Sequence, residues 1–296
     1  MTKTTIPEEE FVFPGGTGCP GCGANLVMRY LLKGLGERTI LSIPACCWAV
    51  MPGYWPSNCL KVPLLYTAFE ATGAAMSGLR AALDIKGVKD VTVVGFAGDG
   101  GTVDIGLQAM SGAAERLTDS IYVMYDNEAY MNTGIQRSGG TPWGAWTTTT
   151  PVGQSHGFKH ESKKDIMAIM QAHRIPYAAT VSPAFPEDFV KKVQKAKAIK
   201  GFRFLHALSP CPPGWRMNPS LSVEVARLAV DTRVFPLYEI EDGKVRITRK
   251  GKGLPLTDYL KAQGRFQHLT EEEISEMQKG IDDNWIRLLL KETSGT

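Results

Sequence analysis

The sequence lacks any apolar run of about 18 residues, the length that a helix needs to cross a bilayer. Its first ten residues include three consecutive glutamates and no apolar stretch typical of a secretory signal peptide. Dense basic runs and basic stretches interleaved with aromatic residues are also missing, and 33 basic against 30 acidic residues give a net charge of only +3. We therefore expect a cytoplasmic protein with neither a nucleic-acid nor a membrane partner. The slight basic excess suits at most an acidic protein partner.

The composition is that of a globular enzyme, with 43% hydrophobic and 21% charged residues over 296 positions. Six cysteines are present, and Cys19 and Cys22 form a C-x-x-C motif. In a reducing compartment such cysteines indicate metal or redox chemistry rather than disulfides. The pair His156 and His160 has helical spacing, but its Gly-rich surroundings favour exposed histidines over a metal site.

Apolar strands alternate with helical patterns through most of the chain, which predicts an α/β fold with a doubly wound, mostly parallel sheet. Residues 1–215 are expected to form the main domain, and residues 216–296 a C-terminal extension that packs on this domain or on a partner. The predicted strands are 39–43, 91–97, 120–125, 177–181 and 202–207, and the predicted helices 25–35, 67–83, 104–117, 164–173 and 186–198. The extension is predicted to contain a helix over 221–232, a hairpin over 237–247 and an amphipathic helix over 271–291.

The most informative local motif is Gly98-Asp99-Gly100 at the end of a predicted strand, with Asn127 at the end of the next one. The carboxyl ends of neighbouring parallel strands open into one crevice, so these residues can form a single site. Mg²⁺ prefers oxygen ligands, which Asp99, Asn127 and the Ala129 carbonyl can supply, while the glycines let the backbone approach a diphosphate. A plain turn is the alternative for an isolated Gly-Asp-Gly. Its position at a strand end, together with Asn127, favours the metal site.

The same residues resemble the binding motif of thiamine diphosphate enzymes, although Asn127-Glu128 stands where many members have two asparagines. More specifically, residues 125–137 and 141–151 resemble the beta subunits of multi-subunit 2-oxoacid:ferredoxin oxidoreductases, and the resemblance runs from about Phe13 to Trp215. It implies that Mg²⁺ and thiamine diphosphate are bound, and that Asn132 lies near the thiazolium ring and the substrate as a catalytic residue. Without the resemblance, Asn132 is more readily interpreted as a turn residue. The cofactor-binding residues that the resemblance implies are Gly98, Asp99, Gly100, Asn127, Ala129, Asn132 and Thr133, with Gln136 also near the pocket.

Four cysteines, Cys19, Cys22, Cys47 and Cys211, can supply the thiolates of either a [4Fe-4S] cluster or a tetrahedral zinc ion. Their spacing does not decide between these two. The resemblance favours the cluster, because beta subunits of this family carry a C-x-x-C pair, an isolated cysteine after the next strand and a distant Ser-Pro-Cys-Pro.

Cys46 departs from the family pattern, which usually reads Ala-Thr-Gly-Cys where this chain has Pro44-Ala-Cys-Cys47. The distance to Val62-Pro63 favours Cys47 as the ligand and leaves Cys46 in the place of a glycine. Cys59 matches no ligand position and is expected to be structural.

The resemblance implies oxidative decarboxylation of a 2-oxoacid, with electrons passing through the cluster to ferredoxin and acyl transfer to coenzyme A. Pyruvate is the first candidate; oxalate, which needs no coenzyme A, and branched, aromatic or dicarboxylic 2-oxoacids stay open. Alpha-, gamma- and delta-type subunits are the expected partners, and the glutamate that activates the cofactor is expected on the alpha-type chain. Two rival functions are a non-redox thiamine-dependent decarboxylase and a zinc-stabilised interaction subunit that binds no thiamine.

Overall fold

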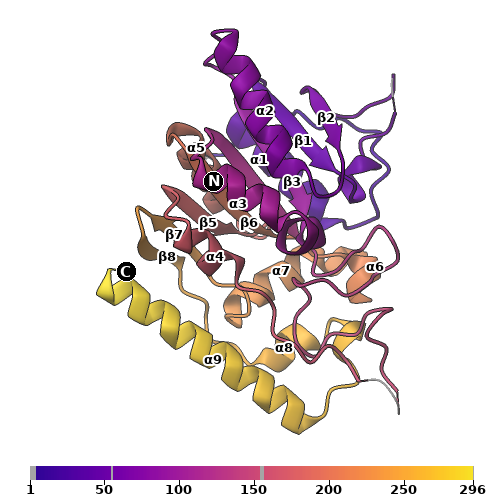
Figure 1. Ribbon diagram of the computed structural model, residues 1–296. Coiled ribbons are helices and arrows are strands. Elements are labelled where there is room, and N and C mark those ends of the chain that lie inside the picture. Colours follow the sequence, from indigo (N-terminus) through magenta and orange to yellow (C-terminus); the bar gives the residue numbers. More distant parts are fainter. Residues whose placement is uncertain (1–4, 55, 154–156, 296) are drawn as a thin grey trace.

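The computed structural model describes residues 5–54, 56–153 and 157–295, which fold around one eight-stranded sheet (Figure 1). The strand order is β2-β1-β3-β4-β6-β5-β7-β8. The six strands from β2 to β5 in this order run parallel, while β7 is antiparallel to β5 and β8 is antiparallel to β7. The strands are β1 (Thr39–Pro44), β2 (Leu64–Thr67), β3 (Thr92–Gly98), β4 (Ser120–Asp126), β5 (Tyr177–Val181), β6 (Phe202–Leu208), β7 (Leu237–Glu241) and β8 (Lys244–Arg249).

Helices cover both faces of the sheet, because the apolar side chains of the central strands alternate between two cores. In β4, Ile121, Val123 and Tyr125 face the core shared with α1 and α5, whereas Tyr122 and Met124 face the core shared with α2, α3 and α4. These helices are α1 (Gly23–Leu35), α2 (Thr72–Ile85), α3 (Leu107–Glu115), α4 (Ile166–Ala172) and α5 (Pro186–Ala198). The predicted doubly wound α/β fold is confirmed.

Residues 216–295 continue the same structure, because β7 and β8 add to the edge of the sheet. Asp242 and Gly243 form the hairpin turn with φ of 48° and 81°, the left-handed conformation that a tight two-residue hairpin requires. The remaining helices are α6 (Pro212–Trp215), α7 (Ser222–Asp231), α8 (Leu256–Leu260) and α9 (Glu271–Ser294). The long α9 lies beside β8 along the outside of the molecule (Figure 1).

Two local predictions were wrong. The helix predicted over 67–83 begins only at Thr72, and the edge strand β2, which ends at Thr67, was not predicted because its four residues are too few for a periodic signal. The helix predicted from residue 104 is preceded by a π-helical turn, Gly101–Ile105, and α3 starts only at Leu107. Among the described residues, no helix combines the length and apolarity needed to span a membrane.

Candidate functional site

The Gly98-Asp99-Gly100 motif and the segment Asp126–Ala129 emerge side by side, because β3 and β4 are parallel neighbours with Gly98 opposite Tyr125. Asp99 is completely buried, and Asn127 and Ala129 are nearly so. The side-chain oxygen of Asn127 faces two other oxygens, Asp99 Oδ1 and the Ala129 carbonyl oxygen, each at 2.9 Å. The structure thus brings together the three groups that the sequence predicts as metal ligands.

Oxygen facing oxygen makes no hydrogen bond, so the Asn127 amide must either rotate, so that its nitrogen donates to both neighbours, or share a cation with them. Mg²⁺ binds oxygens at about 2.1 Å in octahedral geometry, which places adjacent ligand oxygens about 3 Å apart. The observed spacing fits that geometry. Burial and the nearby Asp126 carboxylate raise the pKa of Asp99 well above its usual value in the protein alone, and a bound cation would counter both effects.

The backbone carbonyls of this turn have separate partners. Asp126 O accepts from Ser209 N at 2.9 Å, Asn127 O from Trp215 Nε1 at 2.8 Å, and Glu128 O from Thr141 Oγ1 at 2.7 Å. Only the fourth carbonyl, that of Ala129, turns toward Asp99 and Asn127. The surrounding chain therefore fixes the turn and leaves one carbonyl available to a metal.

Glycines make room around Asp99. A Cβ on Gly100 would lie 2.3 Å from Tyr130 Cε1, and one on Gly140 would lie 2.7 Å from Asp99 Cβ. Ser138, two residues before Gly140, donates its hydroxyl to Asp99 Oδ2 in a short hydrogen bond. Neither Ser138 nor Gly140 was predicted, since nothing in the local sequence shows that their loop folds over Asp99.

Behind the turn lies a buried network of charged groups that sequence reasoning also missed. Asp126 Oδ2 accepts from His206 Nε2 at 2.7 Å and lies 2.5 Å from Lys163 Nζ, which also donates to Glu128 Oε1 at 2.8 Å. Burial alone would lower the pKa of Lys163, but the two carboxylates raise it above its usual value. Burial would likewise raise the pKa of Asp126, but Lys163 and His206 lower it. The network therefore holds Asp126 and Lys163 in their charged forms.

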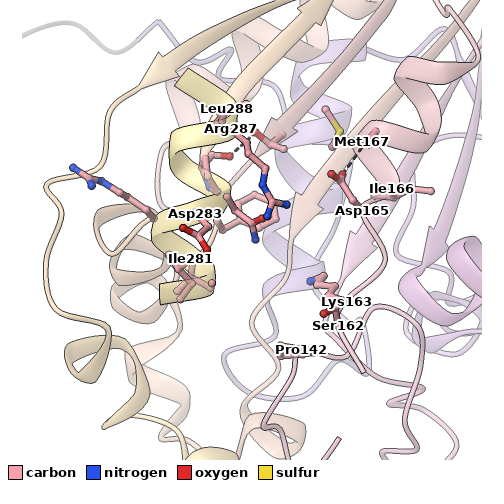
Figure 2. A pocket seen from close by; sticks show the side chains of 18 of the residues that line it. Pro142, Ser162, Lys163, Asp165, Ile166, Met167, Ile281, Asp283, Arg287 and Leu288 are labelled. Carbon is pink, nitrogen blue, oxygen red and sulfur yellow. Dashed lines mark hydrogen bonds between the residues drawn. The ribbon is translucent and has the colours of Figure 1, made fainter. Parts of the chain in front are cut away.

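Lys163 and His206 also line a cavity of about 950 Å³ that extends beneath α9. Figure 2 shows Ser162 and Lys163 at one end of this cavity, and Arg287 and Asp283 on α9 across from Asp165 and Met167 of the α4 region. Asp99, Asn127 and Ala129 are not among its lining residues. This cavity is thus adjacent to the predicted metal site but does not contain it.

We call the segment Asp126–Ala129 the metal turn. The loop that follows it contains Asn132 and Thr133, and both residues are exposed. Thr133 Oγ1 donates to Gln136 Oε1 at 2.5 Å, whereas no hydrogen bond of the Asn132 side chain occurs within the described part of the chain. A Cβ on Gly214 would lie 2.2 Å from the Met131 sulfur and 3.4 Å from Cys211 Sγ, so this loop packs against the Cys211 turn. It therefore connects the metal turn to the cysteines.

The four predicted ligand cysteines all lie at the carboxyl edge of the sheet. Cys22 precedes α1, whose first residue Gly23 donates its N–H to Pro210 O at 2.8 Å, while Cys47 follows β1 and Cys211 follows β6. Burial raises the pKa of Cys47 to about 12, and the charges of Cys46, Cys211, Cys22 and Cys19 add to this effect. The thiols are therefore close enough to influence one another.

The four candidate thiols do not form a tetrahedral site for a single metal ion in the described structure. No three Cys, His, Asp or Glu side chains of the described ranges converge on a one-ion site. Zinc would require sulfurs within about 4 Å of one another, since Zn–S bonds measure about 2.3 Å. A four-iron cluster spreads its thiolates more widely.

The neighbours Cys46 and Cys47 face different surroundings. Burial raises the pKa of Cys46, while hydrogen bonds from the Tyr125 hydroxyl and from the backbone N–H groups of Trp48 and Ala49 oppose the rise. The other three ligand candidates act electrostatically on Cys47 but are absent from the groups that affect Cys46. Cys59 is buried, as expected for a structural cysteine. Of the two predicted exposed histidines, His160 is exposed and His156 lies outside the described residues.

Comparison with known proteins assigns the chain to a family. Residues 47–207 match the family described as "Thiamine pyrophosphate enzyme, C-terminal TPP binding domain". The chain is 52% identical to the ketoisovalerate oxidoreductase subunit VorB of Pyrococcus furiosus, over 97% of this chain and 94% of that one. It is 50% identical to the pyruvate synthase subunit PorB of Methanothermobacter thermautotrophicus, over 94% and 96% of the two chains. It is a beta-type subunit of the thiamine diphosphate-dependent 2-oxoacid:ferredoxin oxidoreductases.

A solved structure shares the fold of this beta-type subunit. The 2-oxoglutarate:ferredoxin oxidoreductase from Magnetococcus marinus superposes with a TM-score of 0.60 at 21% identity, over 76% of this chain and 81% of that one. Because the relatives are subunits, the beta-type chain works within a multi-subunit enzyme. Family membership agrees with the predicted oxidoreductase and not with an interaction subunit that lacks thiamine.

Proposed function

We propose that this beta-type subunit anchors thiamine diphosphate through a Mg²⁺ ion bound by Asp99, Asn127 and the Ala129 carbonyl. The observation that carries the proposal is a buried group of three polar side-chain and backbone groups, with the Asn127 amide 2.9 Å from both Asp99 Oδ1 and the Ala129 carbonyl oxygen, at the carboxyl ends of two parallel strands within the thiamine-binding region. Mg²⁺ would neutralise the Asp99 carboxylate and complete its coordination with diphosphate oxygens and water. Gly98 and Gly100 let the rings of Tyr125 and Tyr130 pack close to this turn, since a Cβ would lie 3.3 Å from Tyr125 Oη and 2.3 Å from Tyr130 Cε1, and their backbone is proposed to approach the diphosphate.

The chain's own residues then position the cofactor. Trp215, Thr141 and Ser138 hold the metal turn and Asp99 in place through their hydrogen bonds. The side-chain amide of Asn132, in the adjoining loop, makes no hydrogen bond within the described part of the chain. We propose that it contacts the substrate and the reactive end of the cofactor. When bound, thiamine diphosphate supplies the nucleophilic carbon and the electron sink for decarboxylation of a 2-oxoacid.

Cys19, Cys22, Cys47 and Cys211 are proposed to hold one [4Fe-4S] cluster. Cys22 and Cys211 precede α-helices, and hydrogen bonds from backbone N–H groups there act to lower the pKa of both thiols, which favours the thiolates that the cluster needs. Cys19, Cys22 and Cys211 act electrostatically on Cys47, so the four thiols lie near one another, and a redox-active cluster suits an oxidoreductase subunit whereas zinc has no redox chemistry. The cluster would take up the electrons that the oxidation releases and pass them to ferredoxin.

For the substrate we propose a short aliphatic 2-oxoacid, with pyruvate and ketoisovalerate as the leading candidates and coenzyme A as acyl acceptor. Relatives named for these two substrates are 50% and 52% identical to the chain, a difference too small to rank them. The partner subunits are proposed to be of alpha, gamma and delta type.

The test is a direct competition between substrates. The subunit, co-expressed with its partners and purified anaerobically, is incubated with coenzyme A, oxidised ferredoxin and both 2-oxoacids, and the acyl-coenzyme A products are quantified. Formation of either aliphatic product in a coenzyme A-dependent manner supports the proposal. Turnover of only an aromatic or dicarboxylic 2-oxoacid, or of oxalate without coenzyme A, would contradict it.

A further inference from the structure

Glu128 occupies an unusual position in the metal turn. It lies between Asn127 and Ala129, its side chain is 4% exposed, and its φ of 70° falls in the left-handed region that bulky residues avoid. No ligand role requires a carboxylate here, since the two flanking residues supply the oxygens that face Asp99. Burial of its charge costs free energy unless the carboxylate is paired, so the side chain must have stabilising partners.

Those partners are two cations from later in the sequence. Lys163, which precedes α4, donates to Glu128 Oε1 at 2.8 Å, and Arg265 Nη2 donates to Glu128 Oε2 at 2.6 Å. Arg265 is itself 2% exposed and is oriented by Gln263 Oε1, which accepts from its Nε at 3.0 Å and its Nη2 at 2.8 Å. Each oxygen of the buried carboxylate is thus held by a fixed cation.

Arg265 also contacts Trp215, which in turn holds the metal turn. Its guanidinium lies 4.0 Å from the centre of the Trp215 ring, and Trp215 Nε1 donates to the carbonyl of Asn127 at 2.8 Å. One arginine, 137 residues beyond Glu128 in the sequence, therefore supports both the side chain of Glu128 and the carbonyl of a proposed metal ligand. The turn's geometry consequently depends on the C-terminal segment around Gly264–Phe266.

We infer that Glu128 is a positioning residue, and that its ion pair with Arg265 sets the affinity of the Asp99–Asn127–Ala129 site for its metal. This inference rests on the metal site of the proposed function. A structural salt bridge would be the simpler explanation, but a buried ion pair contributes little net stability compared with apolar side chains of similar volume. The pair is located on the residue between two proposed ligands, Asn127, whose carbonyl is held by Trp215, and Ala129, whose carbonyl is left available to the metal, and this location points to control of the turn.

The experiment measures metal affinity and stability separately. The subunit is co-expressed with its partner chains, stripped of metal, and titrated with Mn²⁺ in the presence of thiamine diphosphate, with free Mn²⁺ followed by EPR. Melting temperature is recorded on the same samples. The variants are Arg265→Met, Glu128→Gln and the double variant, and the control is Arg203→Met.

Arg203 is a matched control, because it is also a buried arginine, 3% exposed, in an ion pair with Asp119. Arg203 and Asp119 lie at the start of β6 and just before β4, at the amino edge of the sheet, and so away from the metal turn. Arg203→Met should lower the melting temperature while leaving Mn²⁺ affinity as in the wild type.

Each single variant of the Glu128–Arg265 pair should weaken Mn²⁺ binding by about 10- to 100-fold, the usual effect of removing a group that orients a metal ligand. In the double variant the melting temperature should recover, because no buried charge is left unpaired, while Mn²⁺ binding stays weak. The inference would be overturned if Mn²⁺ affinity recovered together with melting temperature in the double variant. It would also be overturned if Arg265→Met left Mn²⁺ affinity unchanged. Failure of the wild type to bind Mn²⁺ with thiamine diphosphate would instead overturn the metal site itself.

Discussion

Replacement of Asp99 by asparagine should separate the stability of the protein from its capacity to bind the cofactor. The substitution keeps the shape of the side chain and removes only its charge. Asp99 is completely buried near the Asp126 carboxylate, with no basic side chain bonded to it in the described structure. A neutral amide removes an unpaired buried charge, so the unliganded variant should melt no lower than the wild type.

The expected rise in melting temperature can be calculated, because a ligand that binds only the folded state raises the free energy of unfolding. A ligand at 100 times its dissociation constant stabilises the folded state by about 2.7 kcal/mol. For a chain of this size about 1 kcal/mol corresponds to roughly 2–4 °C, so Mg²⁺ with thiamine diphosphate should raise the melting temperature by about 5–10 °C. If Asp99→Asn weakens binding about 100-fold, the same ligand concentration contributes only about 0.4 kcal/mol, or about 1–2 °C.

The assay is differential scanning calorimetry of the metal-stripped complex at fixed subunit concentration, with and without Mg²⁺ and thiamine diphosphate. We expect the ligand-induced shift in the wild type and its near loss in the variant. A full shift in Asp99→Asn would show that the carboxylate is not a metal ligand. A steep fall in the melting temperature of the unliganded variant would show that Asp99 has a structural role instead.

Two further pairs of variants test other parts of the site. Gly100→Ala places a methyl group 2.3 Å from Tyr130 Cε1 and should destabilise the protein by about 1–3 kcal/mol, whereas Gly78→Ala, on an exposed helical position with no atom within 4 Å, should stabilise it by up to about 1 kcal/mol. Equal effects in urea unfolding would contradict the steric argument. Cys47→Ala should abolish iron binding, while Cys46→Ala should retain it, because Tyr125 already hydrogen-bonds the Cys46 thiol while Cys19, Cys22 and Cys211 act electrostatically on Cys47. The reverse iron contents would show that Cys46 is the ligand.

The central strands, and the approach of Asp99, Asn127 and Ala129 at the ends of two of them, could be predicted because their signals are local. β3 and β4 are continuous apolar segments that end in polar residues, and parallel strands must bring those ends together. The edge strand β2 has four half-exposed or exposed residues and therefore no comparable pattern. The π-helical turn after Gly100 depends on close backbone packing, such as the 2.1 Å that would separate a Cβ on Gly106 from Gly101 O.

The groups that support the ligands could not be predicted, because their roles arise only from contacts between distant segments. Ser138 lies 39 residues from Asp99, and Arg265 lies 137 residues from Glu128. His206 and Lys163 likewise meet Asp126 only after the sheet has formed. In the sequence alone each is an ordinary polar residue in a strand or loop.

The central claim is that one chain holds both a Mg²⁺–thiamine diphosphate site and an iron–sulfur cluster. The most direct measurement is quantitation of iron, zinc, magnesium and thiamine in the anaerobically purified complex with and without Cys47→Ala, together with EPR spectra before and after a 2-oxoacid is added. The account predicts bound thiamine in both proteins, and loss of about four irons per beta-type subunit and of the substrate-dependent reduced-cluster signal in the variant. Zinc in place of iron at these cysteines, or unchanged iron and an unchanged signal in the variant, would contradict it.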